Sequence, residues 1–292
     1  MAGFLSPIKE LTLHRKACTA IRAYRVEELS ALLSKNEAKK LIRKTSGNVL
    51  RRCLKVAMDN KYIGCIEELL KAGANPRILL DRYRVIDIIY DRGNARLLQL
   101  LLQYGANADS YDGLKSSKPL YIAANHGDFE FFRMLLLYGA DPDYKCFHYD
   151  LVAGTPDDTS VLGICLEKNY EAPFVELLIQ FGANMYLPNI QKALLEVDND
   201  GTRLLDREKA HPRSLKSQCR IAIRRRLKQV GKLRLIHQLE IPNELMEYLQ
   251  YHNEFDDIKK LPRYYDLPCI DTKICLLGER WRTLLQRAAE WT

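Results

Sequence analysis

The same short segment closes four parts of this chain, and its spacing constrains the fold more than any other feature. Each copy has two aliphatic residues, two variable residues, Gly, Ala, and then Asn or Asp. The copies are Leu69–Asn75, Leu101–Asn107, Leu135–Asp141 and Leu178–Asn184. Their glycines, Gly73, Gly105, Gly139 and Gly182, lie 32, 34 and 43 residues apart. Such a period indicates a stack of similar units, each packed mainly on its neighbours.

Each residue of the shared segment has a mechanical role in a helical unit. The aliphatic pair closes a helix against its neighbours, and Gly accepts the left-handed conformation that ends the helix. Asn or Asp then begins a projecting loop by bonding to nearby backbone. A fifth, degenerate unit precedes these four, with Asn36 in the glycine position, because Asn tolerates the left-handed conformation better than most residues.

One unit also carries a distinctive opening, Lys118 to Asp128, which includes Pro-Leu-Tyr-Ile-Ala-Ala. Pro119 is suited to the start of an inner helix and Gly127 to the turn into an outer one. This pattern resembles an ankyrin repeat, whose length is about 33 residues. We therefore expect an all-α ankyrin-repeat solenoid of about five repeats, the first degenerate. The units at 49–75 and 85–107 lack this opening.

A basic segment near the carboxyl end carries a narrow apolar stripe. Leu215, Cys219, Ile223 and Leu227 recur every four residues, so they share one face if the segment is helical. Ser214 is well placed as the N-cap. The stripe either binds a partner or is buried inside its own protein.

Ser214-Leu215, Cys219-Arg220 and Ile223-Arg224 resemble the elongin-binding half of a SOCS box. The stretch from Leu239 to Leu249 resembles its second half, the cullin-5 box, with Glu240 in place of the usual first proline. By this resemblance the elongin-binding residues are Leu215, Cys219 and Ile223. The cullin-binding residues are Leu239, Ile241, Pro242, Leu245 and Tyr248.

The two patterns together resemble the ankyrin repeat and SOCS box family across residues 15–251. The resemblance implies a non-catalytic substrate receptor that binds elongin B/C and cullin-5 with its RING subunit and presents a protein target for ubiquitination. The alternative is an ankyrin scaffold without ligase assembly. A nucleic-acid adaptor is a third class, since the net charge is +8. The basic segment lacks the interleaved aromatic residues that stack on bases, so we expect it to face acidic protein or solvent.

The 43-residue interval leaves room for a long finger that includes Tyr144, Phe147 and Tyr149, a candidate target-binding surface. The finger could equally fold back onto its own solenoid. We expect an N-terminal segment at 1–14, ankyrin repeats at 15–186, and a rigid junction at 187–211. In that junction an Asn-Asp-Gly turn separates two short capping helices. The SOCS box follows at 212–251, then an extension of uncertain order at 252–292.

The composition shows no sign of catalysis. The sequence has no nucleophile elbow, phosphate-binding glycine loop or paired-carboxylate motif. Its eight cysteines include no C-x-x-C pair, and we expect no histidine to lie at metal-ligand spacing from a cysteine. We therefore expect no cofactor and no metal. Without a secretion signal in Met1–Pro7, we expect a location in the cytoplasm, with the nucleus as the alternative.

Overall fold

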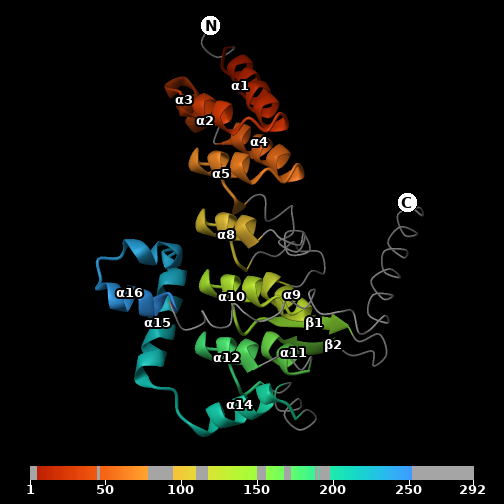
Figure 1. The fold of residues 1–292 in the computed structure, drawn as a ribbon, viewed down its shortest axis with the longest axis vertical. Helices are drawn as coiled ribbons and strands as arrows, with labels where there is room; N and C mark the ends of the chain where they lie inside the picture. The colour runs from red at the N-terminus through yellow and green to blue at the C-terminus, as the bar shows by residue number, and fades with distance from the viewer. Residues whose placement is uncertain are drawn as a thin grey trace, which may run out of the picture.

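The computed structural model describes residues 5–44, 47–77, 95–109, 118–149, 156–167, 172–187, 190 and 198–251. These residues are mostly helical and form one elongated stack, with the amino-terminal helices at one end (Figure 1). The extension expected at 252–292 lies outside them. None of the described helices has the length and apolar character needed to cross a bilayer.

Helices pair in chain order along the stack, as the repeat predicted. The pairs are α1 (Leu5–Arg22) with α2 (Val26–Ser34), α4 (Asn48–Asp59) with α5 (Ile63–Lys71), α9 (Pro119–His126) with α10 (Phe129–Leu137), and α11 (Val161–Glu167) with α12 (Ala172–Gln180). Helix α8 (Ala95–Gln103) is the outer helix of the remaining unit, whose earlier part lies outside the described residues. The helices share one continuous apolar core that includes the paired aliphatic residues of the four shared segments.

The predicted roles of Gly and Asn or Asp are confirmed in all four segments. Each glycine has a φ between +90° and +97°. In the α5 segment the amide of Gly73 donates to the carbonyl of Leu70, and that of Ala74 donates to Leu69. The other three segments repeat this pair of bonds, which caps the helix carbonyls. The Asn or Asp side chain then accepts the amide two residues on, as Asn75 does from Arg77.

The first unit departs from the prediction in two ways. Asn36 does not take the left-handed conformation, because α2 ends at an extended Lys35 and Asn36 begins a further helix, α3 (Asn36–Lys44). Helix α3 replaces the projecting loop, so the chain needs no left-handed turn there. Helix α1 also runs unbroken across the boundary expected between residues 14 and 15.

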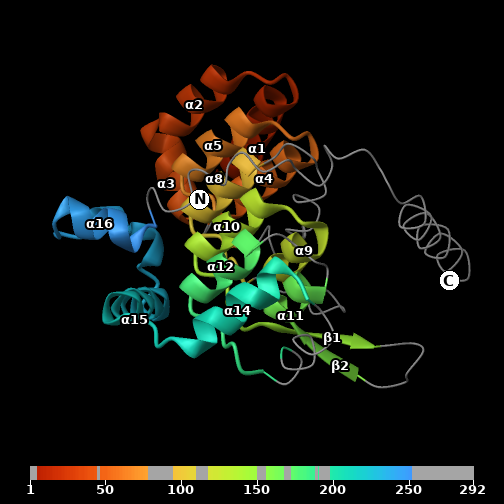
Figure 2. The ribbon, with the colours of Figure 1, turned by 60° about the horizontal axis from the view of Figure 1, so that its bottom comes forward.

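The long interval contains a β-hairpin between α10 and α11. Strand β1 (Lys145–Tyr149) pairs antiparallel with β2 (Pro156–Ser160), with Lys145 opposite Ser160 and Tyr149 opposite Pro156. The sequence predicted a long finger here but not its pairing into strands. The two views place the hairpin on the side of α9 and α11, away from the carboxy-terminal helices (Figures 1 and 2).

Helix α14 (Asp200–Ala210) packs on α11 and α12 and closes the end of the stack. Asn199 is its N-cap, and the Asn199 amide group also donates to the carbonyl of Leu166. The predicted Asn-Asp-Gly turn is wrong, because Asp200 and Gly201 lie inside the first turn of α14. A Cβ on Gly201 would lie 3.0 Å from Val175, so glycine allows this close packing. The first of the two expected capping helices lies outside the described residues.

The chain then turns back along the stack. Helix α15 (Leu215–Gln229), the 3₁₀ helix η1 (Leu233–Gln238) and α16 (Asn243–Leu249) lie beside the outer helices α10 and α12 (Figures 1 and 2). They enclose a small apolar cluster of their own, made of Leu233, Ile236 and Leu249 with Leu227, Leu239, Ile241 and Met246 at its edge.

Candidate partner-binding site

The outward side of α15 carries the predicted apolar stripe. Ser214 caps the helix by accepting the amide of Ser217 at 3.2 Å. The side chain of Leu215 is 75% exposed and that of Ile223 is 39% exposed, and the thiol of Cys219 is free and exposed. Only Leu227, half-buried against the small cluster, turns away from solvent. We name Leu215, Cys219 and Ile223 the apolar ridge, which the described part of the chain leaves exposed.

The opposite side of α15 holds the helix against the stack through Arg224. This buried guanidinium donates to the carbonyls of Leu137 at 2.6 Å and Leu136 at 3.3 Å, both at the end of α10. It also donates to Leu249 at 2.7 Å, at the end of α16. Carbonyls at helix carboxyl ends lack intrahelical partners and carry partial negative charge, so a cation is favourable there. Burial nevertheless lowers the pKa of Arg224 to about 10.

Arg220, the next buried arginine on this face, stacks on aromatic rings. Its guanidinium carbon lies 3.4 Å from the ring centre of Tyr248 and 4.1 Å from that of Tyr251. Tyr251 is fully buried, stacks on Phe181 with centroids 4.2 Å apart, and donates its hydroxyl to the carbonyl of Gln180. These contacts fasten the end of α16 to the end of α12.

The glycines of the shared segments also make room for the carboxy-terminal helices. A Cβ on Gly139 would lie 2.6 Å from a methyl carbon of Leu233, and one on Gly182 would lie 2.9 Å from Ile221. The basic side chains beside these contacts bond to the array. Arg213 donates to the Ala183 carbonyl, Arg225 to Gly182, Arg234 to Gln103, and Lys228 pairs with Asp109 at 2.8 Å.

These contacts correct the expectation for the basic segment. We expected its charges to face acidic protein or solvent, but several of them bind backbone carbonyls of the same chain. Sequence reasoning missed this because the bonded groups are backbone carbonyls up to 131 residues away. The sequence signal that could have revealed it is the coincidence of a basic helix with several helix ends that terminate in Gly.

The second predicted motif divides into buried and exposed residues. Leu239 and Ile241 are half-buried at the edge of the small cluster, whereas Pro242 and Leu245 are exposed. Tyr248 is half-buried beneath Arg220 and Lys216, whose Nζ lies 4.4 Å from the ring centre. Within this motif, Pro242 and Leu245 therefore offer the accessible surface.

The candidate target-binding aromatics are not equivalent. Tyr144 is half-buried against the main core, and Nζ of Lys118 lies 4.5 Å from its ring centre. Phe147 and Tyr149 lie in β1, in the hairpin. The structure places Tyr144 in the array and the other two in the projecting part of the finger.

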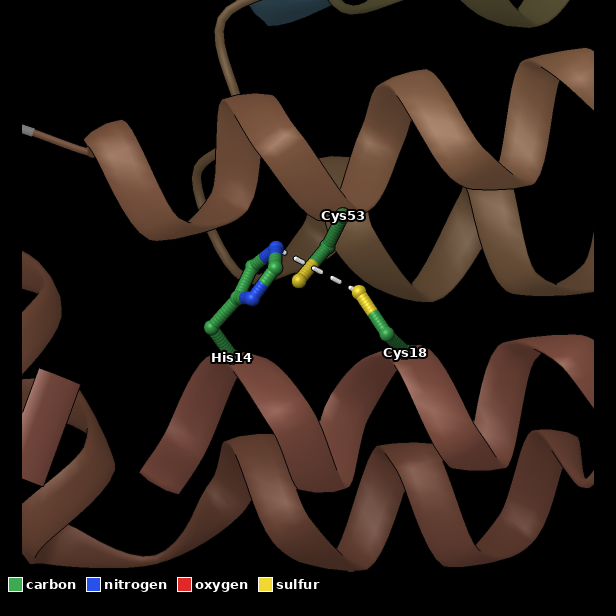
Figure 3. A group of neighbouring side chains, drawn as sticks. All are labelled: His14, Cys18 and Cys53. Carbon is green, nitrogen blue, oxygen red and sulfur yellow. Dashed lines mark hydrogen bonds between the residues drawn. The ribbon is translucent and has the colours of Figure 1, made fainter. Parts of the chain in front are cut away.

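A cluster that the sequence analysis missed lies between the first two repeats. His14 and Cys18 extend from α1, one turn apart, toward Cys53 on α4 (Figure 3). The expectation that no histidine stands at ligand spacing from a cysteine is wrong, because residues four apart share one face of a helix. Recognising this required knowing that residues 5–22 form a single helix.

Two family models match the parts described above. Residues 211–250 match the SOCS box, and residues 118–146 match the ankyrin repeat. The chain joins an ankyrin-repeat array to a SOCS box. The predicted fold class and family resemblance are thereby confirmed. From here on, SOCS box means residues 211–250. The buried Tyr251 follows directly after it.

The chain is similar to Ankyrin repeat and SOCS box protein 12 of Homo sapiens, with 47% identity over 135 residues, which is 46% of this chain and 44% of the human protein. It is 42% identical to the Mus musculus protein of that name over 163 residues, 53% of each chain. Ankyrin repeat and SOCS box protein 1 of Homo sapiens is 33% identical over 141 residues, 45% of this chain and 41% of that protein. The chain spans about half the length of these relatives.

Proposed function

We propose that this protein is a non-catalytic substrate receptor that joins a target protein to an elongin B/C, cullin-5 and RING-subunit ubiquitin ligase. One observation carries the proposal: the apolar ridge of the SOCS box is exposed while the opposite side of the same helix is fixed to the ankyrin array. Exposed leucine and isoleucine on a helix that is bonded to the array are suited to an apolar groove on a partner.

In this proposal the three ridge residues divide the contact with elongin C. Leu215 inserts into an apolar pocket, and Cys219 and Ile223 pack beside it along the helix. The exposed Pro242 and Leu245 contact cullin-5. Leu239, Ile241 and Tyr248 act mainly by shaping this surface, since they pack within the SOCS box.

The ankyrin array holds the target, and the hairpin is its candidate contact element. Tethering raises the local concentration of target lysines near the ubiquitin-loaded enzyme, and this requires no catalytic residue in the receptor. A scaffold that does not assemble with a ligase remains the second candidate function. Such a scaffold would also bind a target through the ankyrin array, but its apolar ridge would not bind elongin C.

The decisive experiment is affinity purification of the full chain from cells, with elongin B/C, cullin-5 and associated proteins quantified by mass spectrometry. The Leu215→Ala and Cys219→Ala double variant should lose at least about 30-fold in elongin recovery, since truncating a central contact costs 2 kcal/mol or more. A matched control is Leu11→Ala, which removes a 61% exposed leucine from α1 and should change nothing.

Two further arms of this purification separate the partners. Pro242→Ala with Leu245→Ala should lower cullin-5 recovery and spare elongin, and deletion of residues 146–157 should lower target recovery alone. Elongin recovery from the ridge variant equal to that from wild type would refute the ligase assignment and leave the scaffold. Circular dichroism on each variant shows whether the fold is intact.

A further inference from the structure

The cluster of His14, Cys18 and Cys53 lies at the interface of the first two repeats, far along the stack from the SOCS box (Figures 1 and 3). Its three potential ligand atoms all lie within 4.8 Å of one another. Nε2 of His14 is 3.4 Å from Sγ of Cys18. Both cysteines are buried, whereas His14 is partly exposed and connects the cluster to solvent.

We infer that His14, Cys18 and Cys53 form a binding site for one Zn²⁺ ion. Zinc sites are tetrahedral and are built from thiolates and imidazoles at about 2.3 Å and about 2.0–2.1 Å, so their ligand atoms lie roughly 3.5–3.8 Å apart. The observed His14–Cys18 distance is already close to this. The upper limit of 4.8 Å means that side-chain shifts of about 1 Å complete the site. Three protein ligands leave the fourth position to water.

The charges of the site suit a dication in a mostly buried place. Zn²⁺ displaces one proton from each thiol, and two thiolates with a neutral imidazole then give a site of zero net charge. This balance matters because both cysteines are buried, where an uncompensated charge would be costly.

The imidazole distinguishes a metal site from an oxidisable cysteine pair. A Cys18–Cys53 disulfide would need no histidine, yet His14 directs a ring nitrogen at the sulfur of Cys18. Because α1 and α4 belong to successive repeats, the metal would join the degenerate first repeat to the second.

The test measures metal in the full chain, expressed with zinc and purified under reducing conditions without chelators. Elemental analysis should find one zinc per wild-type chain, and none in His14→Ala or Cys53→Ser. Losing one ligand should weaken affinity by more than the 10–100-fold typical of outer-shell changes. Cys65→Ser is the matched control, because Cys65 is a buried cysteine on α5 outside the ligand set, and this variant should keep its zinc.

Co²⁺ substitution and proton release supply independent readouts. Cobalt should give thiolate charge-transfer absorption in wild type that disappears in Cys53→Ser, and zinc titration should release protons as the thiols become thiolates. If Cys53→Ser fails to fold, His14→Ala still tests the site, because a partly exposed side chain can be truncated with less effect on the fold. Wild-type zinc no higher than in His14→Ala overturns the proposal. A Cys18–Cys53 disulfide in place of bound metal, seen as a loss of two hydrogens by mass spectrometry, overturns it as well.

Discussion

Replacing Arg224 with methionine should release the SOCS box from the ankyrin array without unfolding the array. Methionine keeps an unbranched apolar stem and removes the guanidinium, whose central carbon lies 5.1 Å from the ring centre of Phe181 and 5.4 Å from that of Tyr251. The carbonyls of Leu249 and Leu137 would then lose their donor in a place that water reaches poorly.

The magnitude follows from these two short bonds. A hydrogen bond from a charged group contributes about 1.5–3 kcal/mol, so two of them contribute about 3–6 kcal/mol. The bond to Leu136 is longer, at 3.3 Å, and adds little. Removing the guanidinium leaves both carbonyls without this donor, and an unsatisfied buried acceptor costs about 1–3 kcal/mol. We therefore expect a loss of about 3–5 kcal/mol in the free energy that docks the SOCS box.

Hydrogen exchange measured by mass spectrometry can detect this loss locally. Amides of residues 215–251 that open when the SOCS box undocks should lose at least about 100-fold in protection, because 1.4 kcal/mol corresponds to a factor of ten. Amides of α4 and α5 should keep theirs. The matched control is Arg226→Met on the same helix, where the arginine is exposed and its side chain donates to the nearby Gln229 side chain. This variant should change protection less than twofold.

Equal protection in Arg224→Met and Arg226→Met would refute this reasoning. That result is physically possible, because replacing a buried ionic group with an apolar side chain is sometimes neutral. It would mean that the carbonyls find water once the guanidinium is gone. Arg224→Lys distinguishes the cases, since an ammonium keeps the charge but cannot span both helix ends as the planar guanidinium does. It should give an intermediate loss.

Two further predictions test the array itself. Gly139→Ala should lower the free energy of unfolding, measured in urea, more than Gly73→Ala does. Both changes place a Cβ at a φ above +90°, which costs about 1–2 kcal/mol. Of the two glycines, only Gly139 has a close neighbour, which adds about 1–3 kcal/mol. Equal losses of stability in the two variants would show that Leu233 of the SOCS box moves to make room for the new Cβ. Burial raises the pKa of the Asp143 carboxyl, so the native state keeps its proton at pH values where the unfolded chain, with a pKa of about 4, has lost it. The free energy of unfolding of wild type should therefore fall relative to that of Asp143→Asn as pH rises from about 4 through the raised pKa. The opposite slope in urea titrations between pH 4 and pH 7 would mean that the charges of Arg213 and Arg225 affect the pKa of Asp143 more than burial does.

The fold was predictable wherever neighbouring residues determine the backbone. Gly at the end of a leucine-rich helix specifies a left-handed cap, and Asn or Asp two positions on specifies the following turn, so the four shared segments were correctly interpreted. Asn36 misled the same reasoning, because Asn is also compatible with a helix start and the sequence alone does not show which helix follows. The apolar stripe was found from its period of four residues, and its exposure agrees with the partner-binding interpretation.

Long-range pairings were not predictable in this way. Arg224 bonds to residues 87 and 88 positions earlier, and nothing local to either segment identifies the other. The His14 and Cys18 pair was within reach, because its spacing of four residues is visible once the segment is taken as helical. Cys53 could join it only after the packing of α1 on α4 was known.

The two sides of α15 together set a constraint on any complex built on this chain. Arg224 on one side binds the ends of α10 and α16, while Leu215 and Ile223 on the other side face solvent. Because the array's own carbonyls hold the helix, the orientation of the apolar ridge relative to the repeats is fixed by folding and not by a flexible linker. The hairpin lies on the other side of the array (Figure 2). A target held there and a partner on the ridge would therefore lie on opposite sides of the same repeats, separated by the width of the paired inner and outer helices.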